Sequence, residues 1–222
     1  MDEFYPIVGE KSMKYSELQH PWNRIFELSW LSVCAGSKAI AAVILSEDGE
    51  IISEARNQIS EFNIPNPRLL HAEVEALRNL DIKKYPNLKE YTLYAGLEPC
   101  PMCVGTLAMS GLRKVVIATR DDFGGSMNLA EHSPFMKRKQ FEITFLDNEL
   151  GDMQRAFQII RELLYNADDI KLGRILADFS VYNKRGVDAA CALVKEGFFE
   201  GRNLNEIPVS EVFDELAKRM EE

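Results

Sequence analysis

Apolar and polar positions along this 222-residue chain alternate between two periods, which predicts helices interleaved with short strands. Spacings typical of amphipathic or buried helices occur at 22–34, 70–80, 103–111 and 149–166. Short apolar or alternating runs, typical of strands, occur at 39–45, 50–56, 91–95, 114–119 and 141–146. Ser46-Glu47-Asp48-Gly49 is a hairpin-turn signal between the first two strands. Helices that alternate with strands in this way predict an α/β layered sheet.

The chain beyond Ala167 has a different character. It contains helical patterns only, at 170–179, 187–196 and 209–220, and it is acidic. We therefore expect a polar lead-in over 1–20, one main domain over 21–166, and an acidic helical extension over 167–222. The extension is expected to mediate assembly, to cover a pocket, or simply to pack on the main domain. Within that domain, Arg120 to Lys139 is expected to be a long loop with little helix.

Composition and charge narrow the cellular setting. A hydrophobic fraction of 46% and a charged fraction of 27% are ordinary for a globular protein. No apolar run approaches the roughly 20 residues that cross a membrane, and Met1 to Lys14 lacks the apolar segment of a secretory signal. We therefore expect a cytoplasmic protein that does not bind a membrane. The formal net charge of −9 disfavours broad polyanion binding, which depends on Lys and Arg, although a local basic patch is compatible with it.

The cysteines differ in what they predict. Cys100 and Cys103 are one helical turn apart, so their thiols lie on one helix face and suit one metal better than two disulfides. Cys34 and Cys191 are single and lie in apolar segments, which predicts buried thiols.

A catalytic zinc ion takes three protein ligands, which His71, Cys100 and Cys103 can supply. Each lies near a predicted helix start, with Pro99 in the first turn of the second helix. His71 and Glu73 are two residues apart, so they can flank one metal only if that helix points its N-terminal end at the site. Glu73 would then take the proton of a zinc-bound water and pass it to the leaving group. The other two histidines are remote in sequence: His20 and His132.

The pattern His71-x-Glu73, followed by Pro99-Cys100-x-x-Cys103, is similar to the signature of the zinc nucleobase deaminases, in the cytidine and deoxycytidylate deaminase superfamily. Two further sets of residues resemble the branch that holds tRNA adenosine deaminases and guanine deaminases: Leu93 to Cys100, and Val115-Val116-Ile117 with Arg120-Asp121. Three segments look most like the tRNA enzyme: Gly125 to Leu129, His132-Ser133-Pro134, and Glu142-Ile143.

This resemblance covers roughly Trp22 to Tyr165, and it implies a three-layer α-β-α cytidine-deaminase-like fold with a five-stranded mixed sheet, in which 21–166 is a zinc deaminase domain. The C-terminal helical extension, 167–222, lies outside the resemblance. The resemblance implies one catalytic Zn2+ per chain, and a homodimer formed by faces around the Cys100 helix and the 120–139 loop. It also implies a set of substrate-binding residues: Asn57, Ala72 through its backbone, Leu97 and Glu98. Asn57 as a turn cap and Glu98 as a helix-start charge are the structural alternatives, and Glu75 is expected to be solvated surface.

Several departures from the tRNA branch bear on the substrate. They are the acidic extension, a longer loop from Asn57 to His71, and three sites in the main domain: Ala39 to Val43 in the first strand, the bulky Leu69-Leu70 pair before the histidine, and Gly96 where threonine or serine is common. Each is expected at the pocket mouth or on the surface that would face a polyanion. The departures therefore favour a small substrate over tRNA.

Together these features predict a zinc-dependent hydrolase of C–N bonds in cyclic amidines, which removes the exocyclic amine of a nucleobase and releases ammonia. A free base, nucleoside or nucleotide is favoured, with a purine preferred. Deamination of adenosine to inosine in tRNA is the alternative. A zinc-binding protein with this fold but no catalysis is the non-enzyme alternative, and Glu73 weighs against it because such a protein needs no proton shuttle.

Overall fold

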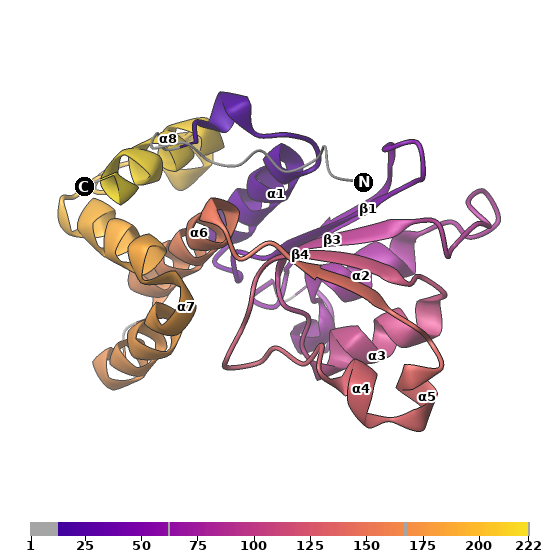
Figure 1. Ribbon diagram of the computed structural model, residues 1–222. Coiled ribbons are helices and arrows are strands. Elements are labelled where there is room, and N and C mark those ends of the chain that lie inside the picture. The colour runs from indigo at the N-terminus through magenta and orange to yellow at the C-terminus, as the bar shows by residue number, and fades with distance from the viewer. Residues whose placement is uncertain (1–12, 62, 167, 222) are drawn as a thin grey trace.

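The computed structural model describes residues 13–61, 63–166 and 168–221, and its centre is a mixed five-stranded sheet (Figure 1). The strands lie in the order β2-β1-β3-β4-β5, with the bounds β1 (Ala41–Leu45), β2 (Ile51–Arg56), β3 (Thr92–Leu97), β4 (Lys114–Thr119) and β5 (Glu142–Phe145). Strand β1 pairs antiparallel with both β2 and β3, whereas β3 with β4 and β4 with β5 are parallel. Strands β2 to β5 therefore all run in one direction and end at the same edge of the sheet.

Helices cover both faces of this sheet, so the predicted three-layer α-β-α fold is confirmed (Figure 1). One face carries α2 (Ala72–Asn79), α3 (Pro101–Ser110), α4 (Leu129–His132) and α5 (Pro134–Lys137). The other carries α1 (Trp22–Cys34) and α6 (Glu149–Tyr165), with α7 (Asp169–Lys195) and α8 (Val209–Met220) packed on them from outside. Three short 3-10 turns complete the elements of the described ranges: Tyr15–Glu17, Pro67–Leu69 and Leu204–Glu206.

The alternation of side chains along the central strands creates two apolar cores. In β3, Leu93 belongs to the core beneath α2 and α3, whereas Tyr94 packs against the core beneath α1 and α6. Strands β1 and β4 alternate in the same way, and both are buried on both faces. This two-sided burial is the reason that these strands are continuous apolar runs, as in Val115-Val116-Ile117.

The C-terminal extension shares the core of the main domain. Phe213 of α8 meets Phe26 of α1 edge-on, with ring centroids 5.1 Å apart, and Phe26 in turn contacts Phe157 of α6. Tyr15 of the lead-in also packs on Phe213, at 5.7 Å. The proposed boundary near residue 167 stays a prediction, and most of the predicted lead-in, 1–12, lies outside the described residues. None of the helices in the described ranges is long and apolar enough to cross a membrane.

One local prediction is refined and another needs correction. The 120–139 segment holds two one-turn helices, α4 and α5, and Pro134 starts the second because its fixed φ suits the first helical position. Cys34 and Cys191 are only half-buried, because both lie at the margin of the core and not within it.

Gly186 gives a test of how closely the extension packs. A Cβ at Gly186 would collide with the carbonyl oxygen of Asp152 in α6, whereas a Cβ at Gly173, also in α7, would meet nothing within 4 Å. We expect Gly186→Ala to lower the free energy of unfolding by about 1–3 kcal/mol through overpacking. Gly173→Ala should raise it by up to about 1 kcal/mol, because alanine favours the helix. Urea unfolding of both variants measures this, and equal stabilities would contradict the close packing of α7 on α6.

Candidate metal centre and active site

The site lies at the edge where the parallel strands end. Asn57, Glu98 and Arg120 directly follow β2, β3 and β4, so the chain direction brings all three to this edge. In open α/β sheets, ligands bind outside the carboxyl ends of the strands. Helices α2 and α3 begin beside this edge and run back across one face of the sheet (Figure 1).

Two of the predicted metal ligands occupy the N-cap positions of these helices. His71 is the N-cap of α2 and Cys100 the N-cap of α3, and neither side chain makes a capping hydrogen bond. A serine side chain that capped either helix would stabilise it by about 1 kcal/mol. Both helices lack this stabilisation because their N-cap residues are His71 and Cys100. Pro101, and not Pro99 as predicted, is the first-turn proline, because α3 begins one residue after Cys100.

The three predicted ligands converge. The Sγ atoms of Cys100 and Cys103 are 3.5 Å apart, and they lie 3.5 and 3.6 Å from Nδ1 of His71. Tetrahedral zinc, with Zn–S of about 2.3 Å and Zn–N of about 2.0 Å, requires donor separations of about 3.5–3.8 Å. Among the described residues, no further His, Cys, Asp or Glu joins this group. Three donors of this kind fit the ligand set of a catalytic zinc ion, which keeps one position for water or substrate.

Electrostatics around the thiols favour metal binding. The hydrogen bond shared by the two cysteines, together with the one to His71, lowers the pKa of Cys100 to about 4, although burial opposes it. The shared hydrogen bond and burial raise the pKa of Cys103. One sulfur is therefore a thiolate at neutral pH before a metal adds its own charge. The positive ends of α2 and α3 also favour negative charge at this point.

Glu73 lies in the first turn of α2, beside the donor group. Its side chain is buried at 4% exposure, and burial raises the pKa of its carboxyl group. Its carboxylate is a hydrogen-bond partner of Cys103. The end-on approach of α2 thus brings Glu73 and His71 to one point although they are two residues apart.

Glu75 is not solvated surface, so that prediction is wrong. It is 6% exposed and forms an ion pair with Arg78. The error has a physical cause: α2 packs on the sheet, where Ser53 Oγ donates to the carbonyl of Ala76, and also on α3. Because α2 packs against both the sheet and α3, more of its surface is buried than its single apolar stripe predicts, and Glu75 lies on that buried surface.

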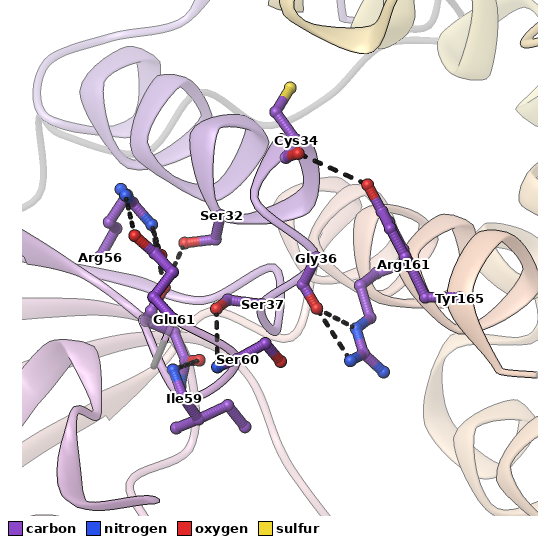
Figure 2. Close-up of polar contacts among 11 residues, drawn as sticks. Ser32, Cys34, Gly36, Ser37, Arg56, Ile59, Ser60, Glu61, Arg161 and Tyr165 are labelled. Atoms are coloured by element: carbon purple, nitrogen blue, oxygen red, sulfur yellow. Dashed lines mark hydrogen bonds and ion pairs between the residues drawn. The ribbon is translucent and has the colours of Figure 1, made fainter. Parts of the chain in front are cut away.

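The loop that follows β2 is fixed to the end of α1, where Ser60 meets Ser37 (Figure 2). Asn57 is the first residue of this loop. Its carbonyl accepts a hydrogen bond from Ser32 Oγ, at 2.9 Å, and Ser37 Oγ accepts one from the amide of Ser60, at 3.1 Å. Its own side-chain oxygen accepts from the amide of Ile59, at 3.2 Å, which is the turn-capping role that the sequence left open. Asn57 is 1% exposed, so it is buried at the edge where the site lies.

Glu98 has a role that neither of its predicted alternatives describes. Its two carboxylate oxygens accept hydrogen bonds from the amides of Asp121 and Met127, at 3.2 and 3.0 Å. The amide of Ser126 also donates to the carbonyl of Pro99, at 3.0 Å. Glu98 therefore holds the loop that follows β4 against the segment that leads into Cys100. Sequence spacing could not predict this role of Glu98, because it depends on backbone amides more than 20 residues away in the chain.

The other residues that the sequence predicted near the site differ in burial and in the face of the sheet on which they lie. Ala72 and Leu97 are buried, and Leu70 is buried while Leu69 is 52% exposed. Gly96 does not face the pocket as expected, since a Cβ there would collide with the side chain of Gln154 in α6. The departure at Gly96 is therefore explained by packing on the opposite face, because neighbouring residues of a strand point to opposite sides.

Known proteins identify the family. Residues 21–119 match the family described as the cytidine and deoxycytidylate deaminase zinc-binding region. A tRNA-specific adenosine deaminase of Bacillus subtilis is 35% identical over 134 residues, which are 58% of this chain and 79% of the relative. The chain belongs to this deaminase family. A cytosine deaminase of Candida albicans is 29% identical over 98 residues, 44% of this chain and 63% of the relative.

The fold agrees with this membership. A solved guanine deaminase from Nitrosomonas europaea shares the fold, with a TM-score of 0.50 and 24% identity over 68% of this chain and 87% of that protein. The predicted cytidine-deaminase-like fold, the hydrolytic deaminase class and zinc as cofactor are therefore confirmed. The base that is deaminated differs among these relatives.

Replacement of single cysteines tests the metal centre. Cys100→Ala should lose zinc and lower the melting temperature, because zinc binding contributes to folding free energy. Cys34→Ala is the matched control: Cys34 is half-buried, and its thiol only donates to the carbonyl of Leu204. Elemental analysis of the purified variants should give about one zinc per chain for Cys34→Ala. A Cys100→Ala variant with a full zinc content would contradict the ligand set.

Proposed function

We propose that this deaminase acts on a nucleobase in a small molecule, a free base, nucleoside or nucleotide, and prefers a purine. The supporting observation is the charge beside the site. Arg56 pairs with Glu61 at 2.5 Å, and Arg120 pairs with Asp147 at 3.1 Å while it lies over the ring of Phe145. RNA binding depends on Lys and Arg that are free to neutralise phosphates, and these two arginines are already paired.

The roles of the metal ligands and of Glu73 follow from their positions. His71, Cys100 and Cys103 would hold zinc, which when bound lowers the pKa of a coordinated water from about 15.7 to about 7. The Glu73 carboxylate, buried beside the metal ligands, would take a proton from that water and deliver it to the exocyclic nitrogen. The products are the oxo form of the base and ammonia.

Four residues are proposed to bind the base. Ala72 would offer its backbone beside the zinc ligand, and Leu97 an apolar contact at the end of β3. Asn57 would use its amide nitrogen, since its side-chain oxygen is already bonded to Ile59. Glu98 would act through the loop that it holds, since both of its oxygens accept from that loop.

Adenosine in tRNA is a second candidate substrate. The observation that favours it is the Bacillus subtilis relative, whose name specifies that substrate and which is 35% identical over 79% of its length. Both candidates require the same metal centre and the same proton transfer, and they differ only in what surrounds the base.

A substrate panel separates the two candidates. Zinc-loaded protein is incubated at moderate temperature with guanine, adenosine, cytidine and cytosine, and in parallel with tRNA anticodon stem-loops, and ammonia and inosine are measured. We expect ammonia from a free purine substrate. Inosine formation in the stem-loop alone would overturn the proposal for a small substrate, and no turnover of any substrate would favour the protein without catalysis.

Isosteric replacement of Glu73 tests the proton shuttle. Glu73→Gln should reduce kcat by roughly 10²–10⁴-fold while zinc stays bound, because general acid–base catalysis contributes that factor. Glu75→Gln provides the matched control, since Glu75 is a buried carboxylate two residues away on the same helix. Turnover within a few-fold of the wild-type rate in Glu73→Gln would mean that the shuttle is assigned wrongly.

A homodimer is the proposed assembly. Large apolar side chains are exposed on α3 and on the segments after β4, where the interface was expected: Met109 at 74%, Phe123 at 82%, Leu129 at 36% and Phe135 at 42%. Light scattering should give twice the chain mass of 25.3 kDa. Met109→Glu should shift this to the mass of one chain, and the exposed residue Ile82, elsewhere on the surface, is the control position.

A further inference from the structure

The C-terminal extension reaches the loop beside the metal centre from the opposite side. Helix α7 is interrupted at Asn183, whose φ of −126° and ψ of 46° are not helical. Its side-chain oxygen accepts a hydrogen bond from Thr119 Oγ1 at 2.6 Å, and its amide nitrogen donates to Asp152 of α6 at 3.4 Å. Thr119 is the last residue of β4 and is fully buried. The kink of α7 is therefore bonded to the point where the loop begins.

A buried arginine makes a second connection. Arg155 of α6 is 1% exposed, and its Nη2 donates to the carbonyl of Arg120 at 2.6 Å. Its Nη1 lies 4.0 Å from a carboxylate oxygen of Asp121. Phe179 of α7 covers the guanidinium, with its ring centroid 4.0 Å from Cζ. An arginine over an aromatic face is attracted electrostatically, and more strongly where water is excluded.

From there the contacts continue to the segment that precedes Cys100. The amide of Glu98 donates to the carbonyl of Thr119 at 3.0 Å, and the carboxylate of Glu98 binds the amides of Asp121 and Met127. The backbone of Gly125 packs directly against the Glu98 carboxylate, and there is no room for a side chain between them: a Cβ at Gly125 would lie only 2.5 Å from the Glu98 carboxyl carbon. Cys100 follows two residues after Glu98. The sequence of contacts thus runs from α7 through the start of the loop to the segment that carries the zinc ligand.

We propose that Phe179 and Asn183 of α7 are positioning residues, which fix the 120–127 loop beside the metal centre so that it can bind the substrate. This rests on the proposed function, because it assumes that the loop contacts the base. The extension would then act on substrate binding and not on zinc. The ligands themselves come from α2 and α3, on the face of the sheet opposite α7.

The effect on kinetics has a definite form. If the 120–127 loop has its substrate-binding conformation in only about a tenth of the molecules, the apparent dissociation constant of the substrate rises about tenfold, because it is inversely proportional to that fraction. The chemical step, once substrate is bound, is unchanged. A higher KM with kcat retained is therefore the signature of a positioning role, whereas general destabilisation lowers the amount of active enzyme and leaves KM as it was.

Hydrogen exchange of the full chain tests the proposal without any substrate. In Phe179→Ala, peptides that cover 120–127 should exchange about tenfold faster, while zinc content stays at one per chain. Tyr182→Ala is the matched control, since Tyr182 is an aromatic residue of the same helix that is 55% exposed. Phe179→Tyr keeps the ring face and should restore slow exchange. If the alanine variant does not fold, Phe179→Leu keeps an apolar contact but not the aromatic face.

If a folded Phe179→Ala or Phe179→Leu variant exchanges its 120–127 amides at the wild-type rate, the proposal that α7 fixes this loop is overturned. Kinetics are then measured on whichever substrate the panel identifies, and KM should rise about tenfold with kcat within about twofold. Fast exchange with unchanged KM would overturn the claim that the loop binds substrate. If no substrate in the panel is turned over, the proposed function fails, but the exchange data still decide whether α7 fixes the loop.

Discussion

Three donor atoms from two separate segments must lie 3.5–3.6 Å from one another, and most of the architecture serves this requirement. Strand β1 lies between β2 and β3 and runs against both, so β2 and β3 end at one edge. The segments after them can then start α2 and α3 side by side. Because His71 and Cys100 occupy the N-caps, the helices lack polar caps, and zinc binding can offset this through its coupling to folding.

The walls of the site are held by polar contacts from the other side of the sheet. The carbonyl of Gly36, at the end of α1, accepts two hydrogen bonds from Arg161 of α6, at 3.1 and 2.8 Å (Figure 2). The end of α1 in turn fixes the loop of Asn57. On the second wall, Arg155 of the same helix binds the carbonyl of Arg120. Helix α6 therefore supports both loops that border the metal centre, although it contributes no residue to the centre itself.

Sequence spacing predicted the chemistry of the site better than its surroundings. Spacing within one helical turn is a local property, so Cys100 and Cys103 could be paired from the sequence alone. His71 is 29 residues before Cys100, and it was grouped with them because it lies at a predicted helix start and matches the family signature. The roles of Glu98 and Gly96 depend on residues that are distant in the chain, Met127 and Gln154, and no periodicity predicts such pairs. The strand and helix order was also predictable, because periods of 2 and 3.6 residues are local. Bounds in the main domain shifted by one or two residues, and the one-turn helices after β4 could not be located because they are too short to show a period. The prediction of two separate helices at 170–179 and 187–196 needs correction, since both belong to α7, which is kinked at Asn183.

X-ray absorption at the zinc edge tests the central claim most directly, because it reports the atoms bound to the metal in the folded protein. Two helix starts that converge on one zinc predict two sulfur neighbours at about 2.3 Å and two nitrogen or oxygen neighbours at about 2.0–2.1 Å. The second light atom is the position left for water or substrate. A shell with three or four sulfurs, or with none, would contradict the ligand set on which the whole account depends.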